Sequence, residues 1–226
     1  SIFIWHRLLI RDNRPWAAWT LAWMLVACGM LTKGLQAPVY FAASVGFYLI
    51  VCKRFRELFR LPNFVGALLF LAIWGSWHVN YIAHAGWDAS FEIYGGDVAM
   101  RFETFSWIKY LWHLAEFPAL LLICLLPWSV LLLAYISRDF RSRLGRSADT
   151  VIFCTLAILI TFPSVWLPSG AKTRYFLPLF PCFAVLCAIV LDQCWAAMGE
   201  QRSAAAASHD SLPVRRSPGA YVSQLL

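Results

Sequence analysis

Six long apolar runs, separated by short polar breaks, constrain this chain more than any other feature of its sequence. Each run approaches the roughly 17 to 25 residues that carry a helix across a bilayer. None alternates apolar with polar residues, as the strands of a membrane barrel do, so helices are favoured. The sequence therefore predicts an all-α fold, a polytopic transmembrane helical bundle of about six spans. The expected spans are Pro15–Leu31, Gln36–Cys52, Pro62–Ala83, Phe117–Ile136, Thr150–Trp166 and Phe176–Ala196.

The composition fits the same class of protein. Hydrophobic residues make up 61% of the chain and charged residues 14%, whereas soluble domains have about 45–50% and about 25%. The net charge of +7 could suggest a nucleic-acid partner. The cations, however, lie in short breaks between apolar runs, which is the pattern of membrane topology. We therefore expect membrane lipids, and no nucleic acid, as partners.

Basic residues mark every alternate break between the runs, which fixes an expected orientation. By the positive-inside rule these breaks face the cytoplasm, so the chain is expected to cross a bacterial inner membrane several times. One of them, Lys53–Arg60, interleaves aromatic residues with cations and is typical of a short amphipathic helix on the membrane surface. The basic positions are Arg7, Arg11 and Arg14, then Lys53, Arg54, Arg56 and Arg60, then Arg138, Arg141, Arg143 and Arg146, and finally Arg202, Arg215 and Arg216.

Two further regions differ from the apolar runs. His84–Glu116 is expected to be a long outer loop, mobile because it is polar and contains several glycines. From the shift to Ala, Ser, Pro and Arg, we divide the chain into a transmembrane region, residues 1–199, and a disordered cytoplasmic tail, residues 200–226. The seven cysteines form no CxxC pair and the histidines have no ligand spacing, so neither a metal nor another cofactor is expected.

The break at Leu31–Gly34 is the first candidate anion site. Lys33 lies next to an apolar run, where a lysine is costly unless it snorkels to water or meets an anion. Gly34 permits a tight bend or the close approach of a ligand. Both interpretations stay open: a contact to a phosphate, or a tight turn with a snorkelling lysine.

The break between the last two runs is the second candidate. Lys172 and Arg174 lie two residues apart, followed by Tyr175, and prolines stiffen the approach. A helix that begins near Tyr175 directs the positive end of its dipole at the outer interface, which favours an anion there. The alternative is that the two cations only anchor helix ends.

Two weaker features complete the set. Arg101, in the expected outer loop, could form two hydrogen bonds with a phosphate or pair with a nearby carboxylate. Pro127, within the fourth run, is expected to kink its helix and so to shape a cavity or simply the bundle.

Taken together in their order, four motifs resemble one family. The chain resembles the bacterial relatives of protein O-mannosyltransferases, which are GT-C-type membrane glycosyltransferases of the aminoarabinose transferase-like superfamily. The resemblance covers about Trp16 to Trp195. The motifs are Thr32–Gly34, Arg101–Phe102, Leu126–Ser129 and Ser169–Pro181.

The resemblance implies transfer of a sugar from a polyprenyl-phosphate donor to a lipid, glycan or protein acceptor at the periplasmic face. It implies that Lys33 and Gly34, together with Lys172, Arg174 and Tyr175, hold the donor phosphate, and that Arg101 lies in a loop that closes over the site. The family's acidic catalytic motif is expected before Thr32 and is missing here, so the catalytic residue is unknown. The chain is therefore expected to be a fragment, inactive alone. Two alternatives stay open: a transporter or flippase subunit, and a non-catalytic truncated scaffold.

Overall fold

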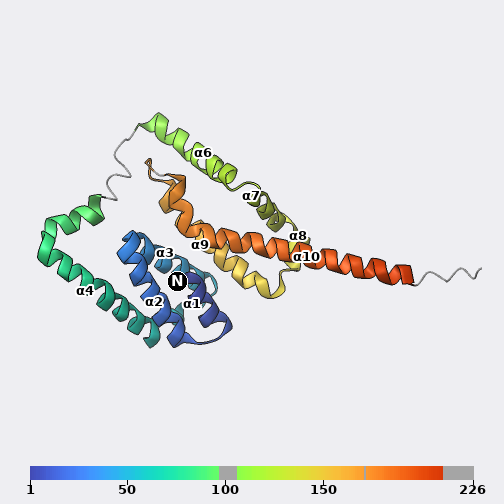
Figure 1. Cartoon of the computed structure of the whole chain (residues 1–226), viewed down its shortest axis with the longest axis horizontal. Coiled ribbons are helices and arrows are strands. Elements are labelled where there is room, and N and C mark those ends of the chain that lie inside the picture. Colours follow the sequence, from blue (N-terminus) through green and yellow to red (C-terminus); the bar gives the residue numbers. More distant parts are fainter. Residues whose placement is uncertain (97–105, 171, 211–226) are drawn as a thin grey trace, which may run out of the picture.

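The computed structural model describes residues 1–96, 106–170 and 172–210, and in these ranges it is helical and has no strand (Figure 1). Five of the described helices are long and apolar enough to cross a membrane, and Gln36–Val51 is a shorter apolar helix. The predicted all-α bundle of about six spans is therefore confirmed. The six helices are α2 (Pro15–Lys33), α3 (Gln36–Val51), α4 (Leu61–Phe91), α6 (Trp107–Cys124), α9 (Ala148–Trp166) and α10 (Phe180–Asp210).

The bundle has two chemically different ends, which polar contacts between helices define. At one end, the Ser164 hydroxyl near the end of α9 donates to Tyr40 Oη near the start of α3, at 3.1 Å. At the other, Tyr48 Oη near the end of α3 donates to Asp149 at the start of α9, at 2.6 Å. We call the first the Lys33 end, because α2 ends there, and the second the basic end. These two contacts show that α3 and α9 run in opposite directions.

The core lies toward the basic end, around a group of buried aromatic rings. Trp5, Trp19, Tyr48 and Phe153 are each at most 1% exposed and meet mostly edge to face. Trp5 belongs to a short helix, α1 (Ile2–His6), which continues as a π-helix, η1 (Arg7–Arg11). The sequence suggested only a basic segment before the first span, whereas residues 2–11 are helical.

Helix α4 lies at the side of the bundle and differs from the prediction at its outer end. It continues to Phe91 and is followed by a π-helix, η3 (Glu92–Gly96), where the sequence predicted a loop. Gly86 has φ 85°, which bends the helix back on itself. As a result Trp74 Nε1 donates to Tyr94 Oη at 3.3 Å across the bend.

The fourth predicted span, Phe117–Ile136, is wrong in both position and continuity. Helix α6 already begins at Trp107 and ends at Cys124, so it occupies part of the predicted outer loop. The chain then breaks before Pro127, which has no N–H for a helix and whose ring clashes with the preceding turn. Two short helices follow, α7 (Trp128–Leu131) and a 3-10 helix, η4 (Leu132–Ile136).

Short helices occupy the remaining breaks, and α10 runs into the predicted tail. These are η2 (Phe55–Phe59), α8 (Arg138–Ser142), η5 (Gly145–Ser147) and η6 (Thr173–Leu179). Helix α10 projects beyond the other helices and reaches Asp210, so residues 200–210 are helical (Figure 1). The rest of the predicted tail, 211–226, lies outside the described residues.

Candidate functional site

The first candidate motif forms the turn between α2 and α3. The Gly34 N–H donates to the Met30 carbonyl at 2.9 Å and closes the last turn of α2. Gly34 adopts φ 67° and ψ −150°, a conformation open almost only to glycine, although a Cβ there would meet no atom within 4 Å. Backbone conformation, rather than space, therefore requires this glycine. The turn leaves the Lys33 side chain exposed.

The second candidate motif forms the approach to α10. Lys172 and Arg174 are exposed, and the Tyr175 N–H donates to the Lys172 carbonyl at 2.9 Å. The Arg174 guanidinium carbon lies 5.7 Å from the centre of the Tyr175 ring. Phe176, only 3% exposed, anchors the segment in the bundle. Arg174 thus lies on a short helix, η6, and Lys172 immediately precedes it, with both side chains exposed.

A cavity of about 250 Å³ adjoins both motifs. Lys33 lines it from the α2–α3 turn, and Pro178 and Pro181 line it from the segment that follows Arg174. The structure therefore brings the two motifs to the same end of the bundle. Lys172, Arg174 and Tyr175 do not themselves line the cavity. The other lining residues are Ser1, Ile2, Phe3, Leu25, Val26, Gly29, Gln36, Ala37, Tyr40, Phe41, Ser44 and Leu179.

The chemistry of this cavity suits an amphiphilic anion. Most of its lining is aliphatic or aromatic, and Lys33 is the only charged side chain among the lining residues. The polar atoms of Gln36, Tyr40 and Ser44 come from one face of α3. An apolar tail with an anionic head would satisfy both the apolar walls and the lysine.

Other sequence candidates lie elsewhere. Asp88 and Glu92 are exposed on the far side of the Gly86 bend and do not line the cavity. His113 Nε2 is 3.0 Å from the Trp166 carbonyl, which ties α6 to the end of α9. Arg101, expected in a closing loop, lies outside the described residues.

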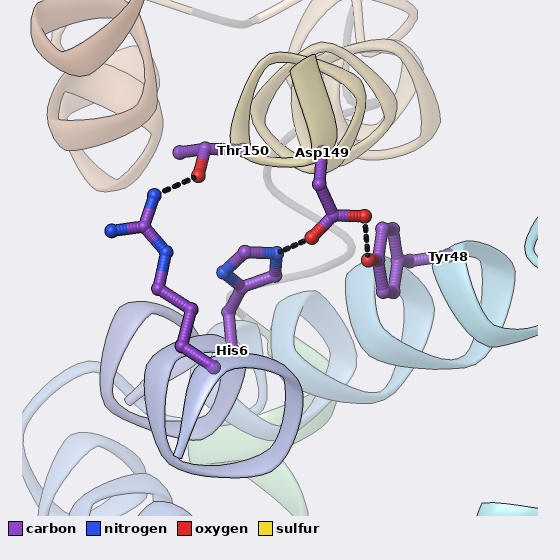
Figure 2. Close-up of polar contacts among 5 residues, drawn as sticks. His6, Tyr48, Asp149 and Thr150 are labelled. Carbon is purple, nitrogen blue, oxygen red and sulfur yellow. Dashed lines mark hydrogen bonds and ion pairs between the residues drawn. The ribbon is translucent and has the colours of Figure 1, made fainter. Parts of the chain in front are cut away.

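The structure also contains a polar cluster at the basic end that the sequence did not indicate (Figure 2). Asp149 accepts from Tyr48 at 2.6 Å and lies 3.0 Å from His6 Nε2. Because a carboxylate only accepts, His6 presents Nε2–H to it. Burial lowers the pKa of His6 below its ordinary value, while Asp149 opposes that shift. Arg11 donates to Thr150 at 3.0 Å beside this cluster.

This cluster joins residues too far apart in sequence for any spacing rule to link them. His6 and Asp149 are separated by 143 positions. The signals available were indirect: a histidine inside an apolar stretch and an acid in the first turn of α9. Its position at the basic end, away from the Lys33 cavity, favours a structural role.

The fold defines a multi-pass helical membrane protein, and the cavity lies at its Lys33 end. In sequence, the chain is similar to two arabinosyl transferases. One is the undecaprenyl phosphate-alpha-4-amino-4-deoxy-L-arabinose arabinosyl transferase of Erwinia tasmaniensis, 26% identical over 185 residues and 76% of this chain. The other is the enzyme of the same name from Pseudomonas aeruginosa, 28% identical over 202 residues and 85% of this chain.

These comparisons confirm the resemblance that the four motifs predicted. The matched part is limited: the chain spans 30% and 34% of the lengths of these two relatives. No family model matches the chain, and no solved structure matches it.

Proposed function

We propose that this chain forms part of a membrane glycosyltransferase that takes its sugar from a polyprenyl-phosphate donor. The names of these two relatives describe transfer of an arabinosyl group and an undecaprenyl phosphate. The acceptor in our proposal is a lipid, a glycan or a protein. The membrane is the bacterial inner membrane, with the Lys33 end toward the periplasm, as the positive-inside rule predicts.

The observation that supports this proposal most is the cavity beside Lys33. It offers apolar walls from residues 1–3, α2, α3, η6 and the start of α10, and Lys33 is the one charged side chain among its lining residues. The apolar walls would hold the prenyl chain, and the lysine would pair with its phosphate. The turn at Gly34 holds the lysine in place because the backbone there is confined to a conformation that few other residues adopt.

In the proposed reaction, the chain's cations stabilise the leaving phosphate. When the sugar is transferred, the bond between the sugar and the phosphate breaks and negative charge grows on the phosphate oxygens. Lys33 supplies a point charge to this anion, whereas Arg174 supplies a planar fork of donors. Lys172 adds a second exposed charge just before η6, and Tyr175 supports Arg174 through its ring.

Binding of undecaprenyl phosphate to the purified chain in nanodiscs tests the proposal. We expect Lys33→Gln to weaken binding about ten- to hundredfold, because it removes a charge-assisted hydrogen bond of about 1.5–3 kcal/mol. Lys109→Gln is the matched control, since Lys109 is an exposed lysine near the start of α6 and does not line the cavity. Equal affinity in both variants would leave the donor site without support.

A further inference from the structure

The elbow between α3 and α4, residues 53–60, has three exposed cations. Lys53, Arg54 and Arg56 are exposed, and none forms an ion pair with the part of the chain that the structure describes. The elbow's own acid, Glu57, is 7% exposed and lies 3.0 Å from Arg60. Its charge is therefore already matched, which leaves the other three cations facing outward.

The elbow lies at the end of the bundle where α2 begins, and its C-terminal side is tied to α2 through α4. Asn63, just after the elbow, accepts from Trp23 Nε1 at 2.9 Å and donates to the Leu58 carbonyl at 2.7 Å. A Cβ on Gly66 of α4 would lie 2.8 Å from the Trp19 carbonyl oxygen, so these two residues lie at about the same level. Leu61 lies about 7.5 Å before Gly66 and Pro15 about 6 Å before Trp19, at about 1.5 Å per residue. The elbow therefore lies at the level where α2 begins, which is the level of the membrane interface if α2 spans the bilayer.

The outer surface of the elbow is also apolar in part. Phe55 is 51% exposed and Phe59 is 72% exposed, while Leu58 packs against the core. Inward contacts therefore fix the elbow and leave aromatic side chains and cations on its outside. Aromatic rings interleaved with cations are typical of segments that lie in the membrane interface.

We propose that this elbow is a binding site for an anionic phospholipid in the leaflet at the basic end. Lys53, Arg54 and Arg56 contact the phosphate, and Phe55 and Phe59 lie among the upper acyl chains. Cations near the ends of membrane spans reach the interface, and the lipid phosphates lie at this level. A soluble acidic partner would account for the cations but not for the exposed aromatic rings, whereas a phospholipid offers both a phosphate and acyl chains. The site is independent of the proposed donor site, which lies at the opposite end.

The test measures retention of phosphatidylglycerol by the full chain in phosphatidylcholine nanodiscs, using native mass spectrometry. The variant Lys53→Gln/Arg54→Gln/Arg56→Gln removes all three charges. Each cation near a membrane surface contributes about fivefold to the binding of anionic lipid, so we expect roughly a hundredfold weaker retention. The charge-preserving variant Lys53→Arg/Arg54→Lys/Arg56→Lys should retain the lipid within about threefold, because the attraction depends on charge.

A second triple variant separates a site from general attraction to the basic end. Arg138→Gln/Arg141→Gln/Arg143→Gln removes three exposed cations on and beside α8. We expect it to weaken retention much less than the elbow variant. Equal losses in the two triple variants would overturn the proposal, since they would reflect only the shared charge. Unchanged retention in the elbow variant would overturn it as well, and would leave a soluble acidic partner as the occupant.

Discussion

Replacement of Asp149 by alanine should destabilise the bundle more than loss of a comparably exposed acid. The Asp149 side chain is 43% exposed, yet its two hydrogen-bond partners come from α1 and α3. The variant leaves His6 and Tyr48 facing each other without an acceptor. His6 is only 4% exposed and Tyr48 only 1%, so water cannot easily replace the carboxylate.

The expected loss follows from these contacts. A hydrogen bond to a charged group contributes about 1.5–3 kcal/mol. Because Asp149 is itself partly solvated, we expect the two bonds together to contribute about 2–4 kcal/mol to the free energy of unfolding. Asp149→Asn keeps one acceptor oxygen, so its loss should be about half as large.

The assay is reversible unfolding in mixed micelles, followed by tryptophan fluorescence. Asp12→Ala is the matched control, because Asp12 is 40% exposed and its contact with Arg7 is 3.9 Å long and solvated. Such surface pairs contribute at most about 1 kcal/mol. If the two alanine variants lost equal stability, the reasoning from the burial of the partners would be refuted.

Other predictions use the same unfolding assay. Gly34→Ala should lose about 1–3 kcal/mol because its φ of 67° suits glycine, whereas Gly46→Ala, in a helix with open space, should be neutral or stabilising. Gly66→Ala should lose about 1–3 kcal/mol, since its Cβ would lie 2.5 Å from a tryptophan ring, and Gly75→Ala should not. Because burial lowers the pKa of His6 in the folded protein, His6 binds a proton at a higher pH in the unfolded chain than in the folded one. Stability should therefore fall as the pH drops below about 6.5, and His6→Gln should weaken that fall.

The apolar runs allowed most of the spans to be predicted, because length and hydropathy alone determine whether a helix can cross a membrane. They did not reveal Ile2–Arg11, which is too short for a span and ends in cations, as a loop would. Its burial depends on Trp5 packing against helices that come later in the chain. Likewise, the polar residues after Ala83 concealed the continuation of α4. This continuation bends at Gly86, so that Tyr94 contacts Trp74 in the earlier part of the helix.

The candidate site could be predicted in part. The order of the spans places Lys33 and Lys172 at the same end, since each follows a span that runs outward. The cavity required the actual packing, because residues 1–3, α2, α3 and the start of α10 all form its walls. The elbow's cations were visible in the sequence, but their level at the start of α2 depends on how α4 packs against α2 at Gly66 and Trp19.

Photoaffinity labelling tests the central claim most directly, namely that a polyprenyl phosphate binds at the Lys33 end. A probe with a photoreactive group near its phosphate would be cross-linked to the chain in nanodiscs and mapped by peptide mass spectrometry. We expect labelled peptides that contain Lys33 and the segment from Lys172 to Pro181, and competition by unlabelled undecaprenyl phosphate. Labelling confined to the basic end, around His6 and Asp149, would contradict it.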